Sequence, residues 1–543
     1  MSFVDVFFRG LEKSPSRPFV TEVRGDRLDR THGGKLLEMI GQARRALREA
    51  GVAPGDRVVL LANNSARWVA ADLAMLAEGA IVVPMYARQA PKELAAMAKD
   101  AGAKVAVAGD AELAQSLVDA GFEGRVLELA SLFSGEPVRA KPHSFADGDV
   151  VTLIYTSGTS GEPKGVMTTA GNVEHMLRVI DSRLTELMGR PGGRDRVFHY
   201  LPFCFAGSRF VLWSNLYREN GVMVSTDLND LLRELKTAAP EWFLNVPALL
   251  ERVRQGVEKK IAERGMPIRR LYEASLDAWR RQRAGEGSVA DRLLVALARR
   301  VIFKAIRQGL GAELRCLICG SAPLGEETQA WFDELLDLPV YQVYGLTETT
   351  AIVSMDRPRA AMPGKVGVPI DGVRVRLGED SELQISGPNV FAGYWGREAA
   401  TKDAFTEDGW FRTGDQASVD ERGRIAIIGR VKNILVPESG HNVAPEPIEQ
   451  LLMDRVPGIA QAVVIGHGRP YLTAILTGGG DREAVARAID AVNAELPHYK
   501  RIRSFHLTSE LLTPESGLLT ANQKLKRRAI EAHFAPAIDG MYA

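Results

Sequence analysis

Residues 155–167 read Tyr-Thr-Ser-Gly-Thr-Ser-Gly-Glu-Pro-Lys-Gly-Val-Met, and they follow a short apolar, β-branched segment over residues 149–154. The apolar segment predicts a buried strand, and the Gly- and Ser-rich run predicts a loop at its carboxyl end. The run combines three glycines, four hydroxyl side chains and one cation: Gly158, Gly161, Gly165, Thr156, Ser157, Thr159, Ser160 and Lys164.

These residue types together suit a bound phosphate group. Glycine lets the backbone approach an anion closely, while N–H groups, hydroxyls and Lys164 can surround its oxygens. A Walker A loop would place its lysine at the start of a helix, whereas here Pro163 precedes Lys164 and Gly165 follows it. The alternative is an ordinary Gly- and Ser-rich surface turn. We favour the phosphate loop, because a turn rarely needs four hydroxyls and a Pro-Lys-Gly ending directly after a core strand.

The composition describes a globular enzyme of more than one domain. A chain of 543 residues is too long for a single core, and 45% hydrophobic with 25% charged residues is ordinary. The 68 basic residues equal the 68 acidic ones, so no net field favours nucleic acid as a partner. The N-terminal residues lack a signal-peptide layout, and no apolar run has membrane-spanning length. We therefore expect a cytoplasmic location.

The cysteines and histidines give no sign of a metal or redox site. Cys316 and Cys319 lie in one strand-like segment, where positions i and i+3 face opposite sides, so a local disulfide is not expected. Buried thiols are the simpler interpretation for these residues and for Cys204. The nine histidines show no metal-ligand spacing.

Strand-like and helical patterns alternate along most of the chain. Residues 57–85 read strand, helix, strand, and further strand-like runs follow with helices between them. This order predicts an α/β fold with doubly wound sheets. After about residue 364, short strands and Gly turns predict a small β subdomain. A boundary near residue 429 separates a large domain, residues 1–429, from a smaller α+β domain, residues 430–543.

Residues 289–307 predict a basic amphipathic helix. Its expected apolar face carries Leu294, Leu297, Val301 and Ala305, with the basic residues largely elsewhere. Such a helix usually covers a core, but it can also lie on a membrane, so peripheral membrane contact is an open alternative.

Further segments carry distinctive polar residues in a fixed order. They are Gly320-Ser-Ala-Pro323, Tyr344-Gly-Leu-Thr-Glu-Thr-Thr350, Asp408-Gly-Trp-Phe-Arg-Thr-Gly-Asp415, Gly429-Arg-Val-Lys432 and Thr520-Ala-Asn-Gln-Lys524. With residues 155–167 they resemble, in order and type, the motifs of the adenylate-forming superfamily. That superfamily includes acyl-CoA synthetases, peptide-synthetase adenylation domains and luciferases. The resemblance implies a large N-terminal domain and a smaller, mobile C-terminal domain.

The resemblance also implies roles for residues of the N-terminal part. Glu348 holds Mg²⁺ together with Thr156, and Thr347 contacts a phosphate. Tyr344, followed by Gly345, stacks on adenine, whose amino group is read by Gln342. The remaining nucleotide contacts come from the phosphate loop and the adenine turn: Thr156, Ser157, Gly158, Thr159, Ser160, Gly161, Lys164, Gly320, Ser321, Ala322 and Pro323.

In the C-terminal part the resemblance implies four roles. Asp415 accepts from the ribose hydroxyls, Arg430 is a second ribose contact, and Lys432 is the hinge between domains. Lys524 is the catalytic cation that bridges the acid and the α-phosphate, with Thr156, Lys164 and Glu348 as the other catalytic residues. Alone, the basic cluster around Lys524 would indicate only a solvated helix start.

The implied reaction joins a carboxylic acid to ATP with Mg²⁺ and then to coenzyme A (CoA). It gives an acyl-adenylate and diphosphate, then acyl-CoA and AMP. Residues 429–449 look most like long-chain fatty acyl-CoA synthetases, so we expect a medium- to long-chain fatty acid. One departure is Phe205, which stands where those enzymes carry histidine in the acyl pocket. An apolar ring there could favour a shorter, branched or aromatic acid.

Two other functions remain open at this stage. An adenylating enzyme can deliver its acyl group to a carrier protein, or act on another carboxylic acid. A nucleotide-binding protein without catalysis is a second alternative, which the intact Lys164, Glu348, Asp415, Arg430 and Lys524 disfavour. The sequence leaves acyl chain length, homodimer formation and lysine acetylation open.

Overall fold

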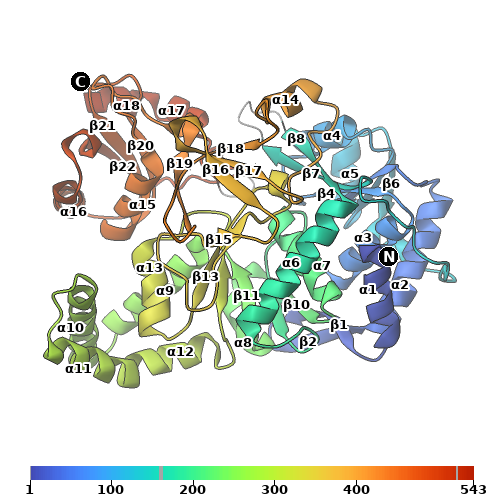
Figure 1. Ribbon diagram of the computed structural model, residues 1–543, viewed down its shortest axis with the longest axis horizontal. Coiled ribbons are helices and arrows are strands. Elements are labelled where there is room, and N and C mark those ends of the chain that lie inside the picture. Colours follow the sequence, from blue (N-terminus) through green and yellow to red (C-terminus); the bar gives the residue numbers. More distant parts are fainter. Residues whose placement is uncertain (1, 158–162, 521–523, 543) are drawn as a thin grey trace. The chain divides into compact units, whose positions relative to one another are not determined.

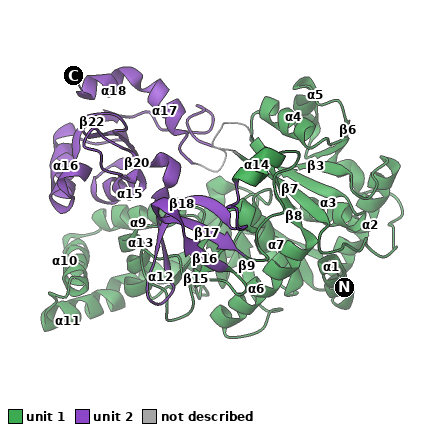
Figure 2. Cartoon of the chain, turned by 45° about the horizontal axis from the view of Figure 1, so that its top comes forward, with its two compact units in different colours: residues 1–373, 387–403 green, residues 374–386, 404–543 purple. Residues whose placement is uncertain are grey.

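A computed structural model describes residues 2–157, 163–520 and 524–542. The chain forms two compact units, coloured separately in Figure 2. The first unit contains residues 1–373 and 387–403, and the second contains residues 374–386 and 404–543.

The first unit contains a nine-stranded sheet that is parallel in its centre and antiparallel at both edges. Its strands, in spatial order, are β15 (Val368–Pro369), β14 (Ser354–Met355), β13 (Val340–Tyr344), β12 (Leu317–Cys319), β11 (Trp242–Asn245), β9 (Arg196–His199), β10 (Gly221–Ser225), β1 (Pro18–Arg24) and β2 (Arg27–His32). The order is typical of a wound α/β sheet, because helices connect the parallel strands.

The first unit also contains a six-stranded sheet, parallel except for its last pair. Its strands, in spatial order, are β6 (Arg125–Glu128), β5 (Val105–Ala108), β3 (Arg57–Leu61), β4 (Ile81–Met85), β7 (Val150–Ser157) and β8 (Pro163–Thr169). Residues 57–85 form β3, α3 and β4, which confirms the predicted strand, helix, strand.

The first unit also contains helices, most of which flank these two sheets, as Figure 1 shows. They are α1 (Phe3–Lys13), α2 (Gly33–Glu49), α3 (Ala66–Ala77), α4 (Pro91–Asp100), α5 (Ala111–Asp119), α6 (Ala170–Met188), α7 (Ala206–Tyr217), α8 (Leu231–Ala238), α9 (Pro247–Ala262), α10 (Met266–Arg283), α11 (Val289–Ala298), α12 (Lys304–Gly311), α13 (Glu326–Ala330) and α14 (Glu398–Asp403). The predicted α/β class with doubly wound sheets is confirmed.

A buried polar network ties two of these helices to strand β7. Asp72 on α3 accepts from Arg209 and, at 2.9 Å, from Trp213 Nε1 on α7. Arg209 also donates to Thr152 Oγ1 on β7 at 2.8 Å. The side chains of Asp72 and Arg209 are fully buried. Removing one member would leave the other charge buried and unpaired, so the network ties α3 and α7 to β7.

The second unit combines an antiparallel sheet with an α+β segment. The sheet contains β16 (Arg374–Leu377), β17 (Glu382–Ser386), β18 (Phe411–Val419) and β19 (Ile425–Arg430), which confirms the predicted small β subdomain. The α+β segment contains β20 (Ile459–Ile465), β21 (Leu472–Gly478), β22 (Ile502–Thr508), α15 (Pro445–Arg455), α16 (Arg482–Glu495), α17 (Arg527–His533) and α18 (Ala535–Tyr542).

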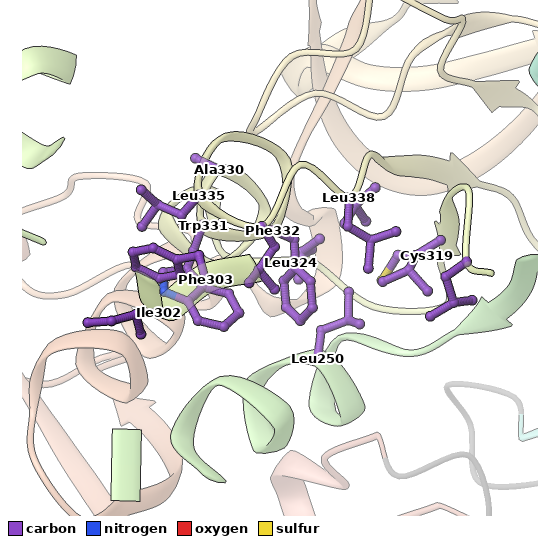
Figure 3. Close-up of a cluster of buried hydrophobic side chains, with 14 of the residues drawn as sticks. Leu250, Ile302, Phe303, Cys319, Leu324, Ala330, Trp331, Phe332, Leu335 and Leu338 are labelled. Carbon is purple, nitrogen blue, oxygen red and sulfur yellow. The ribbon is translucent and has the colours of Figure 1, made fainter. Parts of the chain in front are cut away.

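A large hydrophobic cluster joins the helical layer of the first unit to its nine-stranded sheet. Figure 3 shows Trp331 and Phe332 packed with Ile302, Phe303 and Leu250 beside residues from the sheet. Cys319 ends β12 and Cys316 directly precedes this strand. Both are buried free thiols, as expected.

The predicted helix over residues 289–307 is interrupted, and its expected apolar face is wrong. A π-helical turn at Arg299–Phe303 separates α11 from α12. Leu297 and Val301 are 50% and 51% exposed, while Val295, Ala298 and Ile302 are buried. The buried positions Val295, Ala298 and Ile302 keep helical spacing, so the core-facing side already differs from the expected one before the π turn begins. No helix in the described part of the chain is long and apolar enough to cross a membrane.

Candidate active site

The segment that resembles a phosphate loop forms a β-hairpin. Strand β7 continues to Ser157 and β8 begins at Pro163, so Lys164 lies on a strand and not in the loop that the sequence indicates. Pro163 can begin β8 because this strand is at the edge of its sheet. Four predicted phosphate contacts, Gly158, Thr159, Ser160 and Gly161, lie outside the described residues.

The hairpin places Thr156 and Lys164 on one face. They are directly paired across β7 and β8, and paired residues of an antiparallel ladder project to the same side. Tyr155 lies on the other face, where its hydroxyl donates to Asp100 at 2.8 Å. A Cβ on Gly165 would lie 3.1 Å from the Tyr155 ring, so a side chain at position 165 would press on that ring.

A short turn after β13 carries the predicted metal ligand. Thr347 and Glu348 begin a single 3₁₀ turn, η5 (Thr347–Thr349). Gly345 precedes it in a space where only glycine fits, because a Cβ would lie 2.0 Å from the Ala351 carbonyl oxygen. Thr350 and Ala351 follow with φ of 51° and 78°, a region that is strained for residues other than glycine.

Asn389 and Phe391 hold this turn in place. Thr350 Oγ1 donates to the Asn389 carbonyl at 2.7 Å, and Asn389 Nδ2 donates to the Ile352 carbonyl at 2.9 Å. The Phe391 N–H donates to the Glu348 carbonyl at 2.8 Å. The strained backbone at Thr350 is therefore secured by a segment some 40 residues further along the chain.

Tyr394 joins the hairpin to the turn. Its hydroxyl donates to Glu348 Oε1 at 2.9 Å, and the Lys164 Nζ lies 5.1 Å from the centre of its ring. None of the sequence motifs includes Tyr394. Its signal, an aromatic residue after Gly393, is common in turns and says nothing of its partners.

Glu348 and its surroundings fit a hard cation whose other ligands are mainly phosphate and water. In the described part of the chain, Glu348 Oε2 has no protein hydrogen bond or ion pair, so one carboxylate oxygen is open. Among the described residues, no group of three or more His, Cys, Asp and Glu could hold a metal ion. A single carboxylate beside a phosphate site suits Mg²⁺, which usually keeps substrate and water ligands.

The predicted adenine turn follows β12. The Gly320 N–H donates to the Asn245 carbonyl at 3.1 Å, and a Cβ on Gly320 would lie 2.8 Å from the Val343 carbonyl oxygen. Ser321 adopts φ of 74°. Ala322 and Pro323 follow and are exposed, as Ser321 is.

Gln342 is more enclosed than its predicted role suggests. Its side chain is buried, and its amide nitrogen donates to Gln329 Oε1 at 2.7 Å. Gln329 in turn donates to the Val340 carbonyl at 3.0 Å. The amide nitrogen of Gln342 is therefore occupied, and its oxygen is the atom that could accept from an adenine amino group.

The second unit contains the two predicted ribose contacts as a pair. Asp415 on β18 and Arg430 on β19 are partners in the ladder, and Arg430 Nε lies 2.8 Å from Asp415 Oδ1. Arg430 Nη1 also donates to the Thr413 carbonyl at 3.1 Å. The Asp415 side chain is 6% exposed and that of Arg430 is 37% exposed. The carboxylate is thus fixed in direction while the arginine reaches solvent.

The predicted hinge residue follows directly. Lys432 is exposed and lies in the 3₁₀ turn η7 (Val431–Asn433). Asn433 Nδ2 donates to Glu446 Oε1 at 2.7 Å, which ties the end of this turn to helix α15.

Lys524 lies on one arm of a turn whose tip is outside the described residues. Leu519 and Leu525 form an isolated β-bridge, the Thr520 N–H donates to the Lys524 carbonyl at 2.8 Å, and the Lys524 N–H donates to Thr520 Oγ1 at 3.1 Å. The side chain of Lys524 is exposed.

Arg527 anchors the base of this turn. It donates to both carboxylate oxygens of Glu449 on α15, at 2.8 and 2.6 Å. The two side chains are 15% and 5% exposed. The basic cluster therefore includes one structural arginine and is not simply a solvated helix start.

Phe205 lies just before α7, 5.5 Å from the Tyr86 ring. A separate, small apolar cavity of about 30 Å³ lies among α8, α9, α12 and the nine-stranded sheet, and Phe205 does not line it. Asn245 lines this cavity with an unpartnered, buried Oδ1, and its carbonyl bonds to Gly320. The cavity thus reaches a residue that contacts the predicted adenine turn.

Family models cover nearly the whole chain. A model described as AMP-binding enzyme matches residues 7–395, and one described as AMP-binding enzyme C-terminal domain matches residues 432–543. The chain therefore belongs to the AMP-binding enzyme family, as the motifs indicated.

Similar proteins extend over the full length. The chain is 30% identical to the long-chain-fatty-acid–CoA ligase FadD15 of Mycobacterium bovis, over 94% of this chain and 91% of that protein. It is 25% identical to the long chain acyl-CoA synthetase 3 of Arabidopsis thaliana, over 99% of this chain and 91% of that protein.

Solved structures show the same fold. The adenylation domain of a carboxylate reductase from Mycobacterium chelonae superposes with a TM-score of 0.80 at 21% identity, covering 100% of this chain and 91% of that one. ATP-bound MatB from Rhodopseudomonas palustris gives a TM-score of 0.77 at 22% identity, covering 98% and 99%. At this identity the likeness concerns the fold.

Proposed function

We propose that this chain is an AMP-forming acid–thiol ligase that activates a medium- to long-chain fatty acid with ATP and transfers it to CoA. One observation carries the proposal. Lys164 and Glu348, from two separate motifs, both contact Tyr394, and Thr156 is paired with Lys164 across the hairpin. Relatives named as long-chain-fatty-acid–CoA ligase and long chain acyl-CoA synthetase support a fatty acid as the acid and CoA as the thiol.

In the proposed first step, a carboxylate oxygen of the acid attacks the α-phosphorus of ATP. The bond to the β-phosphate breaks, and diphosphate leaves with the electron pair. Lys164 and the hairpin hydroxyls orient the phosphates, and Lys524 adds positive charge where the acid and the α-phosphate meet. Bound Mg²⁺, held by Glu348 with Thr156, would neutralise phosphate charge.

In the proposed second step, the CoA sulfur attacks the acyl carbon. The thiol loses its proton, the bond from the acyl carbon to AMP breaks, and AMP leaves. We propose that Asp415 and Arg430 bind the ribose, and that Tyr344, Gly345, Thr347, Gln342 and residues 320–323 bind the rest of the nucleotide. We also propose a domain boundary at residues 429–430, with Lys432 as the hinge between the two steps.

Relatives named as long-chain acyl-CoA ligases and synthetases support a fatty acid as the substrate. The apolar cavity beside Asn245 is too small, at about 30 Å³, to hold an alkyl chain. We propose that Phe205 narrows the acyl pocket elsewhere and limits chain length or branching.

Two measurements on the purified chain test the proposal. Exchange of labelled diphosphate into ATP, with acids from acetate to oleate and benzoate, tests the first step. Mass spectrometry for acyl-CoA tests the second. We expect both with fatty acids of medium to long chain. Exchange without any thioester would favour delivery to a carrier protein, and no exchange with any acid would indicate a nucleotide-binding protein without catalysis.

We further propose that the outer face of α11 docks on an anionic phospholipid bilayer. Val289, Leu293, Leu297 and Val301 follow one another at every fourth position and are 70%, 68%, 50% and 51% exposed. Exposed basic residues flank them: Arg292, Arg299, Arg300 and Lys304. The one acidic residue of this stretch, Asp291, is paired with Arg281. An apolar strip with a cationic border is the arrangement that binds anionic lipid interfaces.

Co-sedimentation with vesicles tests this surface. We expect binding to phosphatidylglycerol vesicles and little to phosphatidylcholine vesicles, and loss of binding in the double variant Leu293→Ser, Leu297→Ser. Leu511→Ser, at a residue that is 51% exposed in the second unit, is the matched control. Equal sedimentation of the double variant would contradict the proposal. If the strip instead forms a homodimer, light scattering would show a mass that falls in the double variant. The cytoplasmic location stays a prediction.

A further inference from the structure

We propose that Tyr394 is a positioning residue that keeps Lys164 and Glu348 apart. The Lys164 ammonium can then contact a phosphate, and the Glu348 carboxylate can bind the metal. The inference rests on the proposed function. It concerns a residue that none of the motifs above includes.

Tyr394 contacts the two charged residues in different ways. Its hydroxyl donates to Glu348 Oε1 at 2.9 Å, which occupies one carboxylate oxygen and leaves Oε2 open. The face of its ring lies toward the Lys164 ammonium, 5.1 Å from the ring centre, a distance typical of a cation–π contact. One side chain therefore satisfies both partners without neutralising either.

Lys164 and Glu348 form no direct ion pair, although both approach Tyr394 and both are within the described residues. Opposite charges that approach the same side chain in a partly desolvated site attract one another. A direct pair would consume the carboxylate oxygen that a cation needs and the positive charge that a phosphate needs. The tyrosine ring between them prevents that collapse.

The backbone around Tyr394 is fixed on both sides, so the ring can act as a rigid spacer. On the hairpin side, the Met167 N–H donates to the Gly393 carbonyl at 3.0 Å and the Trp395 N–H to the Gly165 carbonyl at 2.8 Å. The Tyr394 N–H donates to Thr401 Oγ1 at 2.9 Å.

On the turn side, the Phe391 N–H bonds to the Glu348 carbonyl. The Phe391 ring meets the Tyr394 ring edge-on, at 4.8 Å between centres. The Tyr394 ring is therefore held between the phosphate hairpin and the metal turn.

The variant Tyr394→Phe removes the hydroxyl and keeps the ring. We expect the Mg²⁺ concentration for half-maximal diphosphate exchange to rise about tenfold, the size typical for a lost partner of a metal ligand. The calorimetric Kd for ATP without metal should change by less than about twofold, because the contact with Lys164 remains. Tyr394→Leu removes the ring as well, so we expect weaker ATP binding both with and without Mg²⁺.

Tyr155→Phe is the matched control, because it removes a hydroxyl from the same hairpin that bonds to Asp100 and not to Glu348. Its Mg²⁺ dependence should equal that of the unmodified chain. The double variant Tyr394→Phe, Glu348→Gln should be no worse in Mg²⁺ dependence than Glu348→Gln alone, since the hydroxyl is proposed to act through that carboxylate.

Two outcomes would overturn the inference: an unchanged Mg²⁺ dependence of Tyr394→Phe, or additive losses in the double variant. Melting temperatures identify a variant that is merely unfolded, and the conservative Tyr394→Phe is then decisive. If the unmodified chain shows no exchange with any acid, the proposed function fails. The difference in ATP affinity with and without Mg²⁺ still tests Tyr394 in that case.

Discussion

Two lysines that are central to the proposed reaction are held in opposite ways. Lys164 lies on strand β8, half-buried, in register with Thr156 and against the ring of Tyr394. Lys524 is exposed on one arm of a turn, which is closed by one β-bridge and backbone bonds to Thr520.

The difference indicates a division of labour. A cation that is built into a sheet is in position before any ligand arrives, so it can contribute to binding as much as to the rate. A cation on an exposed turn contributes little to binding of the ground state, so its main effect can be to stabilise the transition state. Each prediction below tests one side of this comparison.

The largest effect is expected for Lys524→Ala. The rate of diphosphate exchange should fall on the order of 10³-fold, as for other losses of transition-state charge. The calorimetric Kd for ATP should stay within about twofold, because an exposed lysine contributes little to ground-state binding. Lys526→Ala, two residues further along the same turn, should leave both quantities near normal. A parallel loss of ATP binding would show that Lys524 is a binding residue like Lys164.

The next effect concerns the base of that turn. Arg527→Ala would leave Glu449 buried without its cation and should lower the free energy of unfolding by about 3 kcal/mol. Denaturant unfolding measures this loss, and exchange activity should fall with it because Lys524 loses its anchor. The double variant Arg527→Met, Glu449→Leu should recover most of the stability. If it recovered the activity fully as well, Arg527 would have no role in placing Lys524.

A smaller effect is expected for Lys164→Ala, on the binding side of the comparison. The Kd for ATP should rise about tenfold, or about 1.4 kcal/mol, with a similar rise in the KM for ATP. Lys164→Arg should retain part of the affinity, since it keeps the charge. An unchanged Kd with a strongly reduced kcat would mean that both lysines act only on the transition state.

The smallest effect contrasts a buried carboxyl with a half-buried one. Arg527 accompanies Glu449, whereas burial raises the pKa of Asp333 to about 7, with the Val340 N–H at 2.6 Å opposing the shift. A carboxyl with a raised pKa favours folding below its unfolded pKa of about 4, and this contribution is lost as pH rises toward 7. Asp333→Asn has no titrating carboxyl at this position, so its stability should not fall in this way as pH rises.

Relative to the unmodified chain, Asp333→Asn should therefore become more stable by about 1 kcal/mol between pH 4.5 and 5.5. Denaturant unfolding at both pH values measures the difference. A stability difference that does not change with pH would mean that Asp333 is ionised normally in the folded protein.

Much of the fold could be predicted because its signals are local. The strand, helix, strand order of residues 57–85 and the short strands after residue 364 follow from hydrophobic periodicity and turn residues. The face of the helix over residues 289–307 could not be predicted. Its sequence offers apolar residues on two sides, and packing against the core buries Val295 and Ala298 while Leu293 and Leu297 stay exposed.

The site residues show the same difference between what local sequence signals indicate and what packing decides. The sequence by itself determined which residue types are present for phosphate, metal and ribose, because these chemistries require particular side chains in short, ordered segments. Lys164, Glu348 and Asp415 are all visible in this way. Their roles in this chain stay predictions that the experiments above test.

Only the tertiary structure decided which of these residues meet. It extended β8 back to Pro163, so that Lys164 lies on a strand, and it brought Tyr394 between Lys164 and Glu348. It also paired Gln342 with Gln329 and Arg527 with Glu449. These contacts join segments far apart in the chain or depend on strand register. They are set by how sheets, helices and turns pack together, which no short stretch of sequence specifies.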